Sequence, residues 1–190
     1  VVMTELCRAL VLEPYLASAV ISTAALRPFA SQAHATALLS GIAAGNAIAA
    51  WAHDEAAARH DFAWVETRAE MSGGQWLLTG VKQNVLHAGA ADQWVVSARV
   101  SGEPGEEAGV GLFLVTPSAL GASLRVHRLV DESPAGELRF DATPGIALGD
   151  PLDERQQQPA LAGVRAAGVA ALCAVAVGVM EAAFEMTCRY

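Results

Sequence analysis

Apolar positions recur at helical spacing through residues 1–48, as at Leu6 and Leu10, and this pattern predicts helices. Pro14 interrupts the first run and suits the first turn of a second helix. Residues 31–39 predict a further short helix. We therefore expect residues 1–48 to be helical.

The period changes to two after Ala49. Apolar and polar residues alternate over 65–71, residues 72–74 read Ser-Gly-Gly, and a second apolar run covers 75–79, which together predict a hairpin. Further strands are expected at Trp94–Val100, Val110–Thr116, Leu124–Val130 and Glu137–Phe140. Short strands with turn signals and no intervening helices predict a central antiparallel β-barrel or sandwich over 49–157.

Residues 161–190 return to a helical pattern rich in alanine and glycine. The apolar run is about 20 residues long, which also suits a membrane span. However, Ala and Gly contribute little to insertion, Arg165 lies inside the run, and aromatic or basic anchors do not flank it. We expect instead a buried helix of a helical bundle, because small side chains let helices pack closely. The fold class is then α+β.

Composition and charge narrow the possible partners and location of the protein. The net charge is −8 and the basic residues are scattered singly, which argues against nucleic acid as a partner. Apolar residues make up 53% of the chain against 17% charged, so we expect burial against partner chains. The three cysteines lack CxxC spacing and the first residues lack a signal-peptide pattern, which favours a reducing, cytoplasmic location.

The segment AWAHDEAAARHDF, residues 50–62, is unusually rich in charged and titratable side chains. His53, Asp54 and His60 match no known metal-ligand spacing, so we predict no metal site. Asp54 and Glu55 could split their pKa values as an acid and a base, although adjacent residues seldom face each other. A polar connecting loop is the plain alternative.

A second segment, KQNVLHAGAADQWVVSAR at 82–99, sets His87 and small residues ahead of an apolar strand. Small residues there make a turn, or allow the backbone to approach a flat ligand. A lone loop histidine is more often a surface or hydrogen-bonded residue than a catalyst. The sequence has no GxSxG elbow, no GxGxxG after a strand and no Walker-type loop.

Together these stretches resemble the acyl-CoA dehydrogenase family over nearly the whole chain. AHDEAAARHD lies where the family has its TEPGAGSD-like flavin motif, with Glu55 and Asp61 retained, and KQNVLHAG lies where it has K-x-W/F-I/V-T-N-G. GLFLVTPSALG and AGELRFDATPG look like later β-strands, and AALCAVAVGVMEAAFEMTCRY like the opening of the bundle. The chain begins as though already inside a helix, and its last residues lack a helix stop signal. On this resemblance we therefore expect a chain truncated at both ends, with the end of an N-terminal helical domain at 1–48, a middle β-domain at 49–157 and the start of a C-terminal helical bundle at 158–190.

The departures from the family pattern fall at positions that face the flavin. Asp54 stands where the family usually has Thr, Arg59-His60 replaces a Gly-Ser pair, and Leu86 ends the stretch that normally reads aromatic-x-Thr. The side-chain hydroxyls are lost. Such a pattern resembles a divergent branch that includes small subunits of heteromeric enzymes for dicarboxylic or steroid side-chain CoA thioesters.

The resemblance implies an FAD-dependent subunit that desaturates an acyl-CoA substrate at the α,β bond, in a homotetramer or a heterotetramer with a related subunit. The cofactor-binding residues that it implies are Trp51, His53, Asp54, Glu55, Arg59, His60, Val85, Leu86 and His87. Val85, Leu86 and His87 would lie against the isoalloxazine ring, with Ala88 and Gly89 keeping the turn slim.

The family's catalytic glutamate has two alternative positions. One falls near Gly168, which has no side chain, and the other beyond Tyr190, so no catalytic residue is assigned. Two other hypotheses stay open: a non-catalytic structural subunit of a heteromeric acyl-CoA dehydrogenase, and a flavin-free β-barrel binding module.

Overall fold

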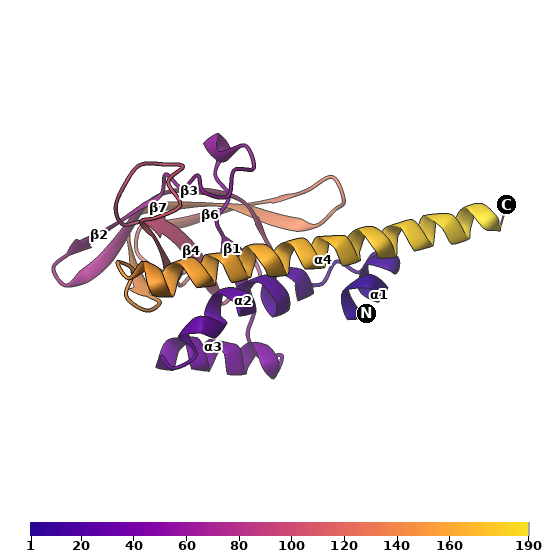
Figure 1. Ribbon diagram of the computed structural model, residues 1–190, viewed down its shortest axis with the longest axis horizontal. Coiled ribbons are helices and arrows are strands. Elements are labelled where there is room, and N and C mark those ends of the chain that lie inside the picture. The colour runs from indigo at the N-terminus through magenta and orange to yellow at the C-terminus, as the bar shows by residue number, and fades with distance from the viewer. Residues whose placement is uncertain (190) are drawn as a thin grey trace.

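The computed structural model describes residues 1–189, in which short N-terminal helices and one long C-terminal helix flank a β-domain (Figure 1). This order confirms the α+β class. The N-terminal elements are α1 (Val2–Arg8), η1 (Tyr15–Ser22), α2 (Thr23–Leu26), η2 (Arg27–Phe29) and α3 (Ala33–Ala43). Pro14 immediately precedes η1, as its place in the sequence predicted.

The β-domain has seven strands, and the short helix η3 (Ala56–Ala58) follows the first of them. The strands are β1 (Ala49–Ala52), β2 (Arg68–Ser72), β3 (Gln75–Leu86), β4 (Gln93–Arg99), β5 (Val110–Val115), β6 (Ala122–Arg128) and β7 (Pro134–Ala147). The predicted hairpin is confirmed as β2–β3, and its turn residues Gly73 and Gly74 both have positive φ, as tight hairpin turns require. Strands β3 and β7 extend well beyond the stretches predicted for them.

The strand pairings close on themselves as in a barrel: β4 with β2, β2 with β3, β3 with β7, β7 with β5, and β5 with β4. Strand β6 adds to β7, and β1 adds to β4 in the parallel sense. The sheet is therefore mixed, which corrects the purely antiparallel expectation. The sequence of β1, AAWA, hides the strand because it is buried on both faces and shows no polar alternation.

Strand β4 separates two hydrophobic cores. Trp94 and Val96 face the barrel interior with Phe113, whereas Val95 faces an outer core shared with Leu161 of the C-terminal helix. Successive side chains of a strand point to opposite faces, so a strand covered on both sides reads as a continuous apolar run. The outer core is what brings the C-terminal helix against the barrel.

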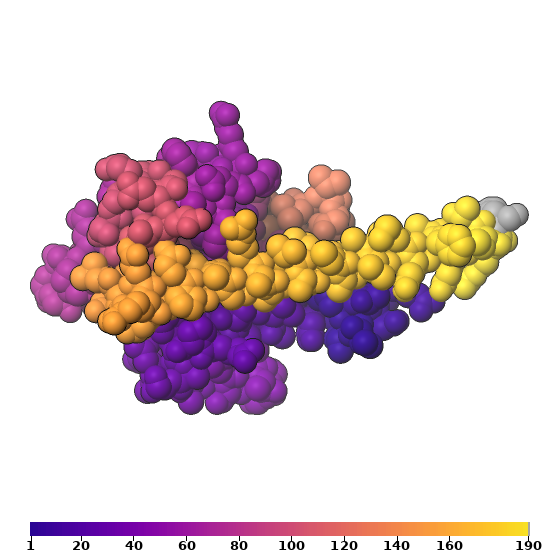
Figure 2. Space-filling model, in the orientation of Figure 1, coloured from indigo at the N-terminus to yellow at the C-terminus, as the bar shows by residue number. Residues whose placement is uncertain are grey.

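The C-terminal helix, α4 (Glu154–Cys188), begins at an Asp153 cap whose carboxylate accepts a hydrogen bond from the Arg155 backbone N–H at 3.1 Å. Figure 2 shows α4 lying along the seam between the β-domain and the N-terminal helices and extending beyond both. Helix α1 packs on the distal half (Figure 1), where Arg8 pairs with Glu185 at 2.6 Å.

The prediction that this helix would be buried is wrong for the described chain. Its buried residues are Gln157, Ala160, Leu161, Val164, Ala171 and Gly178. Large apolar side chains remain exposed at Val169, Leu172, Val177, Val179, Met180, Phe184 and Met186. One layer of neighbours covers only one side of a helix that is apolar all round.

By length and composition α4 also qualifies as a membrane span, a property that it shares with core helices of soluble proteins. The helix was predicted to reach Tyr190, which lies outside the described residues.

Candidate functional site

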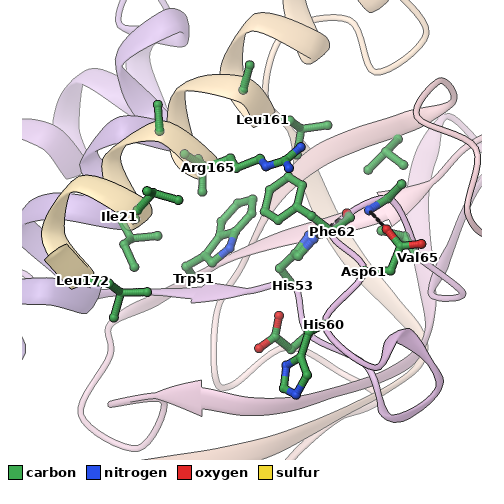
Figure 3. Close-up of a pocket in the computed structure, with 18 of the residues that line it drawn as sticks. Ile21, Trp51, His53, His60, Asp61, Phe62, Val65, Leu161, Arg165 and Leu172 are labelled. Carbon is green, nitrogen blue, oxygen red and sulfur yellow. Dashed lines mark hydrogen bonds between the residues drawn. The ribbon is translucent and has the colours of Figure 1, made fainter. Parts of the chain in front are cut away.

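A cavity of about 1160 Å³ lies between the β-domain and α4. Its β-domain wall comes from β1, the loop that follows it and the end of β3, and its helical wall comes from α4 with Ile21 of η1. Figure 3 shows the rings of Trp51 and Phe62 on the β-domain side and Leu161 and Arg165 on the helical side. Ligand cavities commonly measure about 300–1,000 Å³, so this one has room for a cofactor-sized molecule.

The two segments that the sequence singled out meet at this cavity. The Gln83 N–H donates to the Asp54 carbonyl at 2.7 Å, and the Lys82 ammonium donates to the His53 carbonyl at 3.0 Å. The pairing of β3 with β7 slips between Lys82 and Val85, and Asn84 within this bulge has a φ of 52°. The bulge aims Gln83 and Asn84 at the cavity, as bulges beside functional sites often do.

Of the nine residues implied by the resemblance, five line the cavity: Trp51, His53, Asp54, His60 and Leu86. The other four do not line it: Glu55, Arg59, Val85 and His87. The structure thus brings both segments to one place but turns nearly half of the expected side chains elsewhere.

Strand alternation explains the outcome at the end of β3. Val85 is buried in the barrel core, whereas Leu86, the next residue, borders the cavity. His87 is also buried, and its backbone N–H donates to the Pro134 carbonyl at 2.8 Å. Of Val85, Leu86 and His87, which were expected to share one ligand-facing surface, only Leu86 borders this cavity.

The small residues of the following turn serve the barrel rather than the cavity. Ala88 is buried, and its carbonyl accepts a hydrogen bond from the Trp94 indole at 3.0 Å. A Cβ placed on Gly89 would lie 3.0 Å from Val126 of β6. The slimness of this turn is thus required by its packing against Trp94 and β6.

Arg59 and His60 form a tight turn after η3, with φ values of 47° and 72°. Left-handed backbone is unusual for residues other than glycine, and such strain often accompanies functional loops. The resemblance places a Gly-Ser pair at these positions. The turn leaves Arg59 exposed and directs His60 to the cavity.

A buried ion pair lies directly behind the cavity wall. The Lys82 ammonium, fully buried, contacts Glu55 Oε1 at 2.7 Å, and Glu55 also accepts from the backbone N–H groups of Glu66 and Thr67 at 2.5 and 2.9 Å. Burial lowers the pKa of Lys82 to about 8, although Glu55 opposes this change. Burial alone would raise the pKa of Glu55, but Lys82 and the Thr67 contacts bring it below its ordinary value.

His53 is the buried aromatic residue of this network. Its Nδ1 lies 2.8 Å from Ser97 Oγ, and its Nε2 lies 3.0 Å from the Phe62 carbonyl. The ring stacks on Trp51 with ring centroids 5.4 Å apart, and its centroid lies 4.1 Å from that of the Phe62 ring. Burial, reinforced by the Lys82 charge, lowers the pKa of His53 to about 3, so the imidazole is neutral at physiological pH.

A second buried cation holds the far end of the same loop. The Arg99 guanidinium donates to the carbonyls of Val65 and Ala63 at 2.9 and 3.3 Å. It also donates to the carbonyls of Ala108, Glu106 and Ser101 at 2.8, 2.9 and 3.3 Å. One side chain thereby ties the cavity loop to the loop between β4 and β5.

The helical wall contributes residues that the motifs could not indicate. Arg165 extends from α4 towards the Phe62 ring (Figure 3), and within residues 1–189 it forms no ion pair. Gly168 lies further along the same face, with open space where a side chain would be. Both are about 100 residues from Phe62 in sequence, so only the fold brings them together.

Two further carboxylates border the cavity with Asp54. Partial loss of hydration raises the pKa of Asp54, while Lys82 and His60 act in the opposite direction. Asp61 accepts a hydrogen bond from the Ala63 backbone N–H at 3.0 Å, and Glu107 lies near Gln158 of α4. In the described part of the chain, no three His, Cys, Asp or Glu side chains are placed to hold a metal ion.

Comparison with known proteins decides the family. Residues 50–143 match the sequence profile of the acyl-CoA dehydrogenase middle domain. Through this domain the chain belongs to the acyl-CoA dehydrogenase family. Among curated protein sequences, none matches this acyl-CoA dehydrogenase homologue.

Solved structures extend the likeness beyond the middle domain. A variant of the Tcur3481-Tcur3483 steroid ACAD is 28% identical with a TM-score of 0.81, over 99% of this chain and 47% of that one. The ChsE4-ChsE5 complex of Mycobacterium tuberculosis is 20% identical with a TM-score of 0.78, over 100% of this chain and 48% of that one. Butyryl-CoA dehydrogenase of Megasphaera elsdenii is 21% identical with a TM-score of 0.83, over 99% of this chain and 50% of that one. The last two share the fold, and the chain spans about half the length of each structure.

Proposed function

We propose that this chain forms the β-domain wall and one helical wall of a cleft for FAD and an acyl-CoA thioester. The protein would act as an FAD-dependent acyl-CoA dehydrogenase-like subunit that introduces an α,β double bond. The observation that carries the proposal is the convergence of two segments. Asp54 and Gln83, which belong to the two stretches assigned to flavin by resemblance, are joined by a hydrogen bond at 2.7 Å and border one cavity.

The residues present suit a large, flat ligand with a polar edge. Trp51, Phe62 and Leu86 offer aromatic and apolar surfaces, and the bulge at Gln83 and Asn84 brings backbone and amide groups to the rim. With Asp54 and Leu86 in place of hydroxyl residues, contacts to a flavin edge would come mainly from the main chain. Bound FAD would supply the hydride acceptor for the reaction.

The helical wall supports an acyl-CoA thioester as the substrate class. Arg165 is a cation without an ion-pair partner in the described chain, and it lies among apolar side chains such as Leu161. Guanidinium groups bind phosphate and carboxylate oxygens well. A CoA thioester offers phosphates for Arg165 and an acyl chain for the apolar surfaces.

The partner would be a related subunit in a homotetramer or heterotetramer, in a cytoplasmic protein. Two similar structures carry names that join two components, Tcur3481-Tcur3483 and ChsE4-ChsE5. The exposed apolar side of α4, which includes Leu172, Met180 and Phe184, gives this chain a surface suited to such an assembly.

One observation favours a second function, that of a non-catalytic subunit that completes a partner's site. Gly168 borders the cavity at one of the two positions where the resemblance places the catalytic glutamate, and it supplies no carboxylate. In this case the cleft would bind ligand without providing the base.

Spectroscopy separates these functions. The protein is purified with its related subunit, and acyl-CoA thioesters are added anaerobically. If the thioester causes loss of the oxidised-flavin absorbance, and does so only when this chain is present, the result supports the dehydrogenase. Bound FAD that no thioester reduces supports the structural subunit, and a preparation that takes up no FAD contradicts both and leaves a flavin-free binding module.

A further inference from the structure

The hydrogen bonds behind the cavity wall have a fixed direction that starts at Lys82. Its ammonium has three protons and three acceptors: Glu55 Oε1 at 2.7 Å, the His53 carbonyl at 3.0 Å and Ser97 Oγ at 3.2 Å. Because an ammonium can only donate, Ser97 Oγ accepts from it. The Ser97 hydroxyl proton is therefore free to point to another acceptor, and His53 Nδ1 lies 2.8 Å away.

The far end of the chain of bonds fixes the tautomer of His53. The Phe62 carbonyl can only accept, so Nε2, at 3.0 Å, carries the imidazole proton. Nδ1 of the neutral ring then accepts from Ser97. Lys82 thus donates to Ser97, Ser97 donates to His53, and His53 donates to the Phe62 carbonyl. We name these four residues the Lys82–Phe62 relay.

We propose that His53 is a positioning residue that holds the aromatic wall for ligand. As the neutral Nε2–H tautomer it accepts a hydrogen bond from Ser97, which itself accepts from Lys82 of the buried Lys82–Glu55 pair, and it donates to the Phe62 carbonyl. The ligand part of this inference rests on the proposed flavin-binding function. The tautomer part stands on the geometry of the relay alone.

Other anchors of the loop show why the Phe62 carbonyl matters. Glu55 holds the backbone N–H groups of Glu66 and Thr67, and Arg99 holds the carbonyls of Ala63 and Val65. The stretch that carries the Phe62 ring is tied to the barrel through His53. The His53 ring also packs against both the Trp51 and the Phe62 rings, so its orientation sets both aromatic surfaces of the cavity.

The charges around the ring favour the neutral form. The groups that act on the ring are Lys82 and Glu55, Asp54 is the next residue along the loop, and Arg99 lies near Lys82. A protonated His53 would place a second N–H against the Ser97 hydroxyl beside the Lys82 ammonium. The strongly lowered pKa of His53 agrees with this picture.

The test compares two buried serines in the full chain. Ser97→Ala removes the donor to His53, whereas Ser22→Ala removes an equally buried hydroxyl that donates to the Ala17 carbonyl at 2.7 Å outside the relay. Long-range proton–nitrogen NMR reports the His53 tautomer, with His53→Gln to identify its signals. Titration with FAD reports ligand affinity in the same variants.

The relay predicts a single Nε2–H tautomer in the wild type and in Ser22→Ala, and in Ser97→Ala a shifted Nδ1 signal, because Nδ1 loses its donor while the Phe62 carbonyl still holds Nε2–H. It also predicts FAD binding about fivefold weaker in Ser97→Ala than in Ser22→Ala, the effect of one net hydrogen bond. An Nδ1–H or charged ring in the wild type, or equal changes in both serine variants, overturns the relay. If the wild type binds no FAD, the proposed function fails while the NMR result still decides the relay.

Discussion

The two walls of the cavity are built on opposite physical principles. The β-domain wall is held by buried charges: Lys82 with Glu55 at one end of the loop, and Arg99 at the other. The α4 wall is made of small and apolar residues such as Ala162, Ala166 and Gly168, and much of the rest of the helix is exposed.

This difference assigns different tasks to the walls. A buried cation with every proton satisfied allows one geometry, because a displaced partner would leave an uncompensated polar group. A small-residue helix surface adapts more easily and leaves space for whatever lies against it. The barrel side of the cavity thus fixes position, and the helical side provides room.

Removing the cation behind the loop should have the largest effect. Lys82→Met leaves the Glu55 carboxylate buried without its partner, and we expect a loss of roughly 3–5 kcal/mol in the free energy of unfolding. Urea denaturation measures it. Arg128→Gln, which removes the exposed partner of Glu132, is the control and should cost less than about 1 kcal/mol. Equal small losses would show that the barrel wall does not depend on the buried pair.

Arg99→Lys tests the other anchor with the charge retained. A lysine has three donors on a flexible stem and cannot replace a planar fork that reaches five carbonyls, so we expect a loss of roughly 2 kcal/mol. Hydrogen exchange should speed up in residues 63–66 and 101–108. Faster exchange in α4 instead would contradict the conclusion that Arg99 holds the β-domain wall and not the α4 wall.

Acid should weaken the barrel wall through His53. Its pKa is about 3 in the folded chain and about 6.5 when unfolded, so between these values the unfolded state binds more protons. The contribution of His53 is fully present above about pH 6.5 and is lost as the pH falls towards 3. Unfolding measured across this range should show a shallower pH dependence in His53→Gln, and identical slopes would refute the buried neutral histidine.

Two glycines of α4 should respond in opposite ways. Gly168 has open space at its Cβ position, so Gly168→Ala should stabilise the helix by about 0.5–1 kcal/mol. A Cβ on Gly178 would run into the Thr4 carbonyl of α1, so Gly178→Ala should destabilise and loosen α1. Thermal unfolding compares the two variants. Equal shifts would mean that α1 does not pack on α4 as described.

The sequence predicted those features that depend on local pattern. The β2–β3 hairpin, the run of strands from β4 to β7 and the long C-terminal helix all follow from periodicity and turn residues. Strand β1 was missed because AAWA is buried on both faces and carries no alternation.

The site was harder to predict because it depends on contacts between distant segments. The two loop segments could be identified from their unusual composition and their resemblance to a family. Which side chains face the cavity depends on the bulge at Asn84, which sends Val85 to the core and Leu86 to the cavity. The pairing of Lys82 with Glu55 and the position of Arg165 at the cavity could not be deduced without the fold, since their neighbours are far away in sequence.

The most direct test of the central claim is to fill the cavity from its adaptable wall. Ala166→Trp places a large ring in the space between α4 and Phe62, whereas Ala183→Trp makes the same change on an exposed part of the same helix away from the cavity. FAD is titrated into the wild type and both variants, with unfolding measured in parallel. The account predicts binding to the wild type and to Ala183→Trp, and its loss in a folded Ala166→Trp. Binding that survives in Ala166→Trp would contradict it.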